Sequence, residues 1–135
     1  WGVPDSAAAA RMLEEELAAG IGAMKELAKR GVRVLPGGDY GFAWNPIGAN
    51  ARDIAHFVDL LEMPAMQAII AATRMGAELM GMDGELGTIR PGHLADLIVV
   101  RGDPLREPAI LRDRERIVAV MKDGVFHRQS LNAAR

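Results

Sequence analysis

The chain has 135 residues, a formal net charge of −2 and a pI of about 5.9, so it lacks the basic surface expected of a nucleic-acid-binding protein. It contains no cysteine, which excludes disulfides and thiolate metal sites. Its 135 residues can form one ordinary domain or parts of two. A complete (β/α)8 barrel is excluded, because that fold takes about 250 residues.

The sequence shows no sign of a membrane partner. No apolar run approaches the roughly 18 residues of a membrane span. The alanine-rich start is interrupted by Glu14, Glu15 and Glu16 and lacks the basic segment of a signal peptide. We therefore expect a soluble, cytoplasmic protein.

The first predicted element is a long helix that starts after Asp5 and Ser6, two good N-cap residues, and ends at Gly31. Gly20 and Gly22 indicate either close packing or a break into two helices. Apolar residues at spacings of three and four predict one buried face, made of Leu13, Leu17, Ile21, Met24 and Ala28.

A strand, a loop and two further helices are predicted next. The β-branched run over residues 32–35 predicts a buried strand, and residues 39–49 form a loop that holds three aromatic residues. Asn50 is expected to cap a helix over residues 50–61. A second helix, with a proline in its first turn, is expected over residues 64–80.

After Gly81 the apolar pattern changes from that of helices to that of strands. Nearly continuous apolar runs predict strands over residues 94–100 and 117–121. Asp123-Gly124 is a strong two-residue hairpin signal and leads into a short third strand over residues 125–127. The C-terminal part is therefore predicted to be a small β unit.

Two blocks of residues together carry a family resemblance. The first, residues 31–39, is a short strand that ends in Pro-Gly-Gly-Asp. The second starts with Ala-Ala-Thr at residues 71–73, continues with Gly-x-Ile-x-x-Gly-x-x-Ala-Asp-Leu at residues 87–97 and closes with Met-Lys-Asp-Gly at residues 121–124. In order and spacing they resemble the C-terminal portion of the amidohydrolase superfamily, in particular its imidazolonepropionase-like and Xaa-Pro-dipeptidase-like metal-dependent hydrolases.

The resemblance implies an α/β fold with a (β/α)8 TIM-type barrel and a small composite β-sandwich assembled from both chain ends. Residues 1–81 would supply the last helix–strand–helix elements of the barrel, and residues 82–135 the C-terminal strands of the sandwich. The metal-binding histidines would lie upstream. The chain would then be an incomplete, inactive C-terminal portion that pairs with the missing N-terminal portion or associates with itself.

Asp39 is the candidate catalytic residue. Barrel enzymes place catalytic groups at the C-terminal ends of their strands, where the resemblance puts this carboxylate. The resemblance implies that Asp39 is both a metal ligand and the general base beside a divalent metal, zinc being the first candidate. From the local sequence alone, an Asx-turn residue in a Gly-Gly-Asp loop is the alternative.

The loop after Asp39 carries the candidate substrate-binding residues. Tyr40, Trp44 and Asn50 could contact a small-molecule substrate at the mouth of the barrel. The alternatives are that the aromatic side chains pack beneath the loop and that Asn50 only caps a helix. Arg52 could meet a substrate carboxylate or lie at the surface.

The remaining polar residues of the signature are predicted to be structural. Asp96 and Asp103 are expected to fix turns around a buried strand. His56, His93 and His127 do not have the spacing of a zinc site, which needs three or four ligands in one cluster. These features do not add a second catalytic centre.

The function implied by the resemblance is metal-dependent hydrolysis of an amide-like C–N bond in a non-peptide or dipeptide substrate. A non-catalytic structural or oligomerisation module derived from the same fold is the main alternative, because unpaired strand edges favour association. A domain that binds a small molecule through the aromatic loop without chemistry is a further one.

Overall fold

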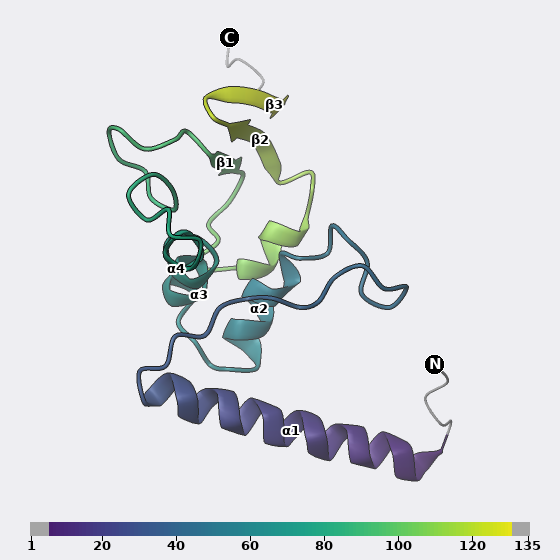
Figure 1. Cartoon of the computed structure of the whole chain (residues 1–135). Helices are drawn as coiled ribbons and strands as arrows, with labels where there is room; N and C mark the ends of the chain where they lie inside the picture. Colours follow the sequence, from purple (N-terminus) through teal and green to yellow (C-terminus); the bar gives the residue numbers. More distant parts are fainter. Residues whose placement is uncertain (1–5, 131–135) are drawn as a thin grey trace. The chain divides into compact units, whose positions relative to one another are not determined.

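The computed structural model describes residues 6–130 of the chain (Figure 1). They divide between Val34 and Leu35 into two compact units, which we describe separately. This division does not coincide with the boundary at residue 81 expected between barrel and sandwich elements, which stays a prediction. No helix in residues 6–130 is long and apolar enough to cross a membrane.

The first unit consists mainly of α1 (Ala7–Lys29). Ser6 is its N-cap, as predicted, and its side-chain oxygen accepts a hydrogen bond from the Ala9 N–H at 3.2 Å. Gly20 and Gly22 lie within one uninterrupted helix, so the predicted alternative of two helices is wrong.

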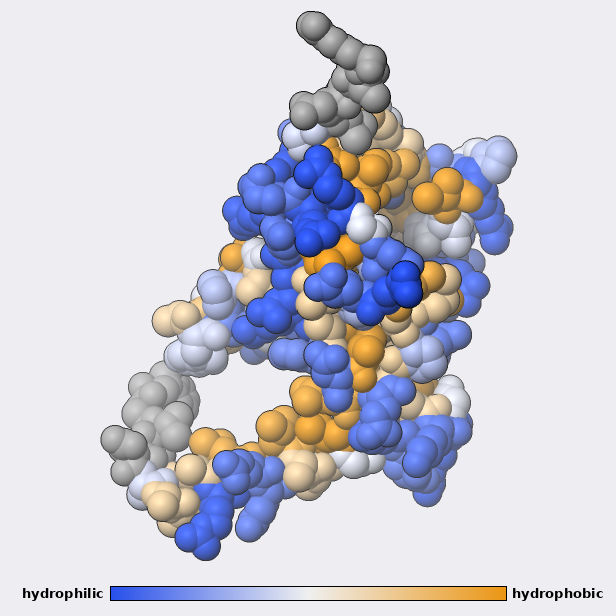
Figure 2. Space-filling model, turned by 180° about the vertical axis from the view of Figure 1, so that it is seen from behind, coloured by the Kyte–Doolittle hydropathy of each residue, from blue (hydrophilic) through white to orange (hydrophobic). Residues whose placement is uncertain are grey.

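The buried face predicted for α1 is not formed. None of the α1 residues is buried, and Leu13 and Leu17 are 51% and 58% exposed. Figure 2 shows apolar side chains at the surface along this helix. An amphipathic stripe becomes buried only against a second apolar surface, and the described residues of the first unit supply none. Asp5, the other predicted cap, lies outside the described residues.

The strand predicted over residues 32–35 is also absent. These residues have no strand partner, although Val34 is buried. A parallel barrel strand is held by neighbours on both sides, and within residues 6–130 every strand lies after residue 96. The barrel that the resemblance implies is therefore not seen in this part of the chain.

Three short helices build the helical part of the second unit: α2 (Arg52–Asp59), α3 (Ala65–Ala72) and α4 (Arg74–Leu79). The predicted helix over residues 64–80 thus forms as two helices. The break is at Thr73, whose φ of −122° and ψ of −86° are not helical and whose hydroxyl donates to the Ile69 carbonyl at 2.7 Å.

The signature residue Gly87 lies against this break. Its φ is +79°, and a Cβ there would come within 2.8 Å of the Arg74 Cα, 2.9 Å of the Ala77 Cβ and 2.9 Å of the Thr73 carbonyl oxygen. These distances are shorter than side-chain carbons tolerate. The position therefore needs glycine both for its backbone conformation and for its close packing.

The core of the second unit is small. Helix α2 packs against α3 and against the 3-10 helix η1 (Pro108–Arg112), which the sequence did not predict. Most of its buried side chains are small or medium-sized. They are Ala55, Phe57, Ala68, Ala71, Ala77, Ile110, Leu111, Val118 and Ala119.

The predicted β unit is confirmed as a three-stranded antiparallel sheet, in the order β1 (Leu97–Val100), β2 (Ile117–Lys122) and β3 (Val125–Gln129). Leu97 pairs with Met121, and Lys122 pairs with Val125 next to the turn. Asp123 and Gly124 both have positive φ, of 49° and 76°, as the hairpin signal requires.

Strand β1 is more exposed than its apolar sequence predicts. Ile98 and Val99 are 48% and 38% exposed on opposite faces of the strand. The expectation of a buried strand is wrong here because β1 is an edge strand, whereas Val118 and Ala119 of the central strand β2 are buried. Figure 2 shows apolar side chains at the surface of the molecule next to the C-terminal end.

Asp96 and Asp103 fix turns, as predicted. Asp96 binds the hairpin turn through both carboxylate oxygens: Oδ1 accepts from the Asp123 N–H at 2.6 Å, and Oδ2 accepts from the Lys122 ammonium group. Asp103 accepts from the Leu105 N–H at 2.9 Å. The Ala-Asp-Leu and Asp-Gly parts of the signature are therefore joined by direct hydrogen bonds.

We expect the attachment of this hairpin to weaken in acid. The hydrogen bonds from Lys122 and the Asp123 N–H lower the pKa of Asp96 below its ordinary value of 3.8. Because the folded pKa is the lower one, the stabilisation is complete above the unfolded value and is lost as the pH falls through the folded value. The protection factor of the Asp123 amide, measured by NMR hydrogen exchange and corrected for the intrinsic rate, should fall as the pH drops below about 4.

The Asp96→Asn variant is the control for this experiment. An amide cannot titrate, so exchange at Asp123 should be faster than in the unmodified chain at neutral pH and should show no extra acid-dependent step. The same acid step in both proteins would show that another group is responsible.

Candidate functional site: the loop from Asp39 to Arg52

Asp39 lies at the start of an irregular loop that leads into α2. Its φ is +49°, a left-handed conformation that aspartate and asparagine tolerate better than most residues. The residue is exposed, and within residues 6–130 its carboxylate has no hydrogen-bond or ion-pair partner. The Asx turn considered as the alternative is therefore not formed, and the carboxylate is available to a ligand.

Asn45 holds the backbone around Asp39. It is the one buried polar residue in the described range, 8% exposed, and its Nδ2 donates to the Gly38 carbonyl and, at 3.0 Å, to the Asp39 carbonyl. Its Oδ1 accepts from the Arg52 guanidinium group. The Gly41 N–H donates to the Asn45 carbonyl at 2.9 Å. The conformation at Asp39 is thus fixed by one side chain that the sequence analysis did not single out.

Tyr40 is half-buried and engaged with its own chain. Its hydroxyl donates to Asp53 Oδ1 at 2.5 Å, and the Arg52 guanidinium lies 5.4 Å from the centre of its ring. Burial and the Asp53 carboxylate raise the pKa of Tyr40, while Arg52 acts in the opposite direction. The phenol therefore stays protonated at neutral pH, with its hydrogen donated to Asp53.

Phe42 and Trp44 form a separate aromatic pair. Their rings stack with centres 5.2 Å apart and planes 6° apart. Trp44 is 66% exposed. Within the described residues, the predicted aromatic pocket is therefore divided: these two rings form an exposed platform, and Tyr40 contacts Arg52 and Asp53.

Asn50 does not cap α2, so this prediction is wrong. The N-cap is Ala51, and no side chain bonds to the first turn. The Asn50 Oδ1 instead accepts from the Gly48 N–H at 3.1 Å and closes the turn at that residue. Asn50 and Tyr40 together line a cavity of about 280 Å³, whereas Trp44 lies outside it. A role of these three residues in substrate binding stays a prediction.

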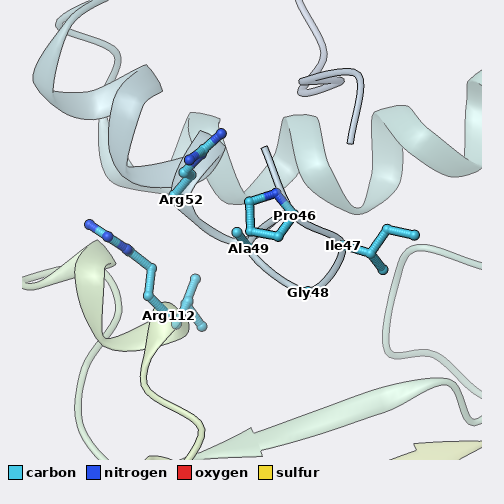
Figure 3. A pocket seen from close by; sticks show the side chains of 7 residues that line it. Pro46, Ile47, Gly48, Ala49, Arg52 and Arg112 are labelled. Atoms are coloured by element: carbon cyan, nitrogen blue, oxygen red, sulfur yellow. The ribbon is translucent and has the colours of Figure 1, made fainter. Parts of the chain in front are cut away.

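A second cavity of about 350 Å³ lies between this loop and η1 (Figure 3). Arg52 reaches it from α2 and Arg112 reaches it from η1. The remaining lining residues are Pro46, Ile47, Gly48, Ala49 and Leu111. The Arg52 Nε atom is buried without a hydrogen-bond partner.

The described residues do not form a metal site by themselves. Residues 6–130 contain no group of three histidine, aspartate or glutamate side chains that could hold an ion. His56 and His127 are exposed, and His93 Nδ1 lies 3.2 Å from the Thr88 hydroxyl. Asp39 would supply a single carboxylate ligand, whereas a zinc site takes three or four.

Sequence comparison matches the profile of the amidohydrolase family to residues 4–126. The 5-methylthioadenosine/S-adenosylhomocysteine deaminase of Moorella thermoacetica is 34% identical over 103 residues, which are 71% of this chain and 23% of that protein. The protein of the same name from Syntrophobacter fumaroxidans is 38% identical over 97 residues, 63% of this chain and 21% of that protein. The chain therefore spans about a quarter of the length of these relatives.

Solved structures likewise match this chain over only part of their own length. A Xaa-Pro dipeptidase with methionine bound in its active site superimposes with a TM-score of 0.72 and 32% identity, over 80% of this chain and 25% of that chain. Ochratoxinase of A. niger superimposes with a TM-score of 0.81 over 96% of this chain and 29% of that chain. Its identity is 22%, so this second likeness concerns the fold alone.

Proposed function

Because this chain belongs to the amidohydrolase family, we propose that it is part of a metal-dependent hydrolase that cleaves an amide-like C–N bond of a small molecule. The observation that carries the proposal is the position of Asp39. The family match includes this residue, and its carboxylate is exposed without a partner in residues 6–130. A residue needed only for the loop would be expected to use its side chain there.

In this proposal Asp39 is the general base. Its carboxylate takes a proton from water as the water oxygen attacks the substrate carbon, and returns that proton to the nitrogen as the C–N bond breaks. Asn45 and Arg52 keep the Asp39 backbone in place. A divalent metal, with zinc as the first candidate, would polarise the reacting groups. Most of its ligands would come from residues outside this chain.

The proposed substrate is a small molecule with such a C–N bond. The relatives named above are deaminases and a dipeptidase, and both names describe cleavage of a C–N bond. A non-peptide or a dipeptide substrate is therefore compatible with the likeness.

We further propose that the 135-residue chain is inactive by itself and pairs with the remaining part of such a hydrolase. The short length relative to the relatives and the single metal ligand support this. The exposed faces of α1 and β1 also support it, since each would be buried by an apolar partner surface.

Elemental analysis of the purified chain tests this proposal directly. After dialysis we expect far less than one zinc, manganese or iron ion per chain, and no hydrolysis of 5-methylthioadenosine or of a Xaa-Pro dipeptide. A single carboxylate does not retain an ion through dialysis. A stoichiometric ion together with turnover that survives Asp39→Ala would contradict both the incompleteness and the role of Asp39.

The second candidate function is a non-catalytic oligomerisation module. The outer edges of β1 and β3 are unpaired within the described sheet, and such edges can pair with another chain. Light scattering of the metal-free chain distinguishes the candidates. A concentration-independent oligomer of defined size would favour the module, and a monomer would exclude it.

A further inference from the structure

The cavity between the loop and η1 has a composition that the proposed reaction does not explain. Its volume is about 350 Å³, within the range of small-molecule sites. In Figure 3, Arg52 and Arg112 lie on one side of the loop and Ile47 lies on the other. One wall is therefore cationic, and the rest is mainly aliphatic.

A third cation lies beside the same loop. The Arg114 Nη2 atom lies 3.0 Å from the point that a Cβ on Gly48 would occupy. In residues 6–130, neither Arg112 nor Arg114 has an ion-pair partner. Positive charge is thus concentrated around the turn at Gly48.

The aspartates that follow Arg52 and Arg112 in the sequence interact with other residues. Asp53 accepts the Tyr40 hydroxyl, and Asp113 lies 3.8 Å from Arg116. Neither aspartate lines the cavity. Neither aspartate forms an ion pair with Arg112 or Arg114 within residues 6–130.

The Arg52 guanidinium group is incompletely paired, because its buried Nε atom has no hydrogen-bond partner. Buried donors are nearly always hydrogen-bonded, and an unpaired one costs free energy. The other end of the same guanidinium is already bonded to Asn45. An anion bound in the cavity would compensate the positive charge of this guanidinium group, whose side chain lines the cavity.

We propose that this cavity binds the carboxylate group of a small aliphatic anion. Arginine matches the geometry of a carboxylate, and the Pro46, Ile47, Ala49 and Leu111 side chains would contact its aliphatic body. The inference goes beyond the proposed function, because binding requires neither a metal nor turnover. Arg52 also connects the cavity through Asn45 to the Asp39 carbonyl, so a ligand here would lie next to the loop that carries Asp39.

NMR titration of the full 135-residue chain tests the proposal. The probe is 3-methylbutanoate, and its amide is the neutral control of the same shape. We expect saturable shifts of the Gly48 and Ala49 amides with the carboxylate and at least tenfold weaker binding of the amide. Inorganic phosphate, added separately, shows whether any anion suffices. Phosphate binding as strong as that of the carboxylate would overturn the assigned ligand class.

Two charge-removing variants and one matched control complete the test. Arg112→Gln should weaken carboxylate binding by about tenfold, because it removes a charged hydrogen-bond donor that lines the cavity. Arg114→Gln should weaken it less, because Arg114 contributes positive charge beside Gly48 without lining the cavity. Arg90→Gln removes the same charge from an exposed turn that does not line the cavity and should leave binding unchanged. Absence of saturable shifts, or equal weakening in all three variants, would overturn the proposal whether or not the chain takes part in hydrolysis.

Discussion

Replacing Asp39 by asparagine should lower kcat by about 1,000-fold once this chain forms part of an active hydrolase. The substitution removes the carboxylate that accepts and returns the proton, and it keeps a side chain of nearly the same size. A suitable protein is a chimera in which this chain replaces the matching segment of the Moorella thermoacetica deaminase, to which it is 34% identical. The measurement is release of ammonia from 5-methylthioadenosine by the chimera with and without the substitution.

Asparagine is the informative replacement because it also tolerates the left-handed backbone at Asp39, where φ is +49°. The effect on kcat is then not mixed with backbone strain. Asp83→Asn is the matched control, since Asp83 is an exposed turn residue outside the loop. If the Asp39→Asn chimera kept a kcat within tenfold of the parent, Asp39 would not be the general base.

Replacing Gly87 by alanine should destabilise the chain by about 2–4 kcal/mol. The new Cβ would come within 2.8 Å of the Arg74 Cα and 2.9 Å of the Thr73 carbonyl oxygen, and neither backbone atom can move without moving α4. The positive φ of 79° adds strain for any residue that has a Cβ. Urea denaturation followed by circular dichroism gives the change in the free energy of unfolding.

Gly84→Ala is the control for this substitution. Gly84 lies in the same connection between α4 and β1, and a Cβ there would meet nothing within 4 Å. We expect its free energy of unfolding to change by no more than about 0.5 kcal/mol. Equal urea midpoints for the Gly84→Ala and Gly87→Ala variants would mean that the close approach at Gly87 does not contribute to stability.

Features that depend on neighbouring residues could be predicted from the sequence. Ser6 caps α1, and Asp123 and Gly124 turn the hairpin, because their own backbone preferences determine those conformations. The turn-fixing roles of Asp96 and Asp103 also followed from their place in the signature.

Features that depend on distant partners could not be predicted in this way. Residues 32–35 have the composition of a buried strand, yet a strand needs a ladder partner, and none lies in residues 6–130. The apolar face of α1 and the apolar residues of β1 were recognised correctly as surfaces that require burial. Apolar periodicity therefore identifies a surface that is favourable to bury, but the surface becomes buried only when a second apolar surface packs against it.

The candidate site was predictable only in part for a related reason. The family resemblance singled out Asp39, and the structure places its carboxylate at an exposed position. Asn45 was missed because its importance comes from bonds to the Gly38 and Asp39 carbonyls and to Arg52, which exist only once the loop is folded. A polar residue directly before Pro46 in an aromatic loop was the one available signal.

The break between α3 and α4 has a consequence for how this sequence can evolve. Gly87 reaches the helices at the point where Thr73 leaves helical geometry, so the turn before the sheet and the helix break fit one another as a pair. A mutation that made the two helices continuous would change the surface that accepts Gly87, and a larger residue at 87 would require a wider break. Residues at positions 73, 74 and 87 should therefore covary among related sequences. This couples a signature glycine to a threonine fourteen positions earlier in the chain.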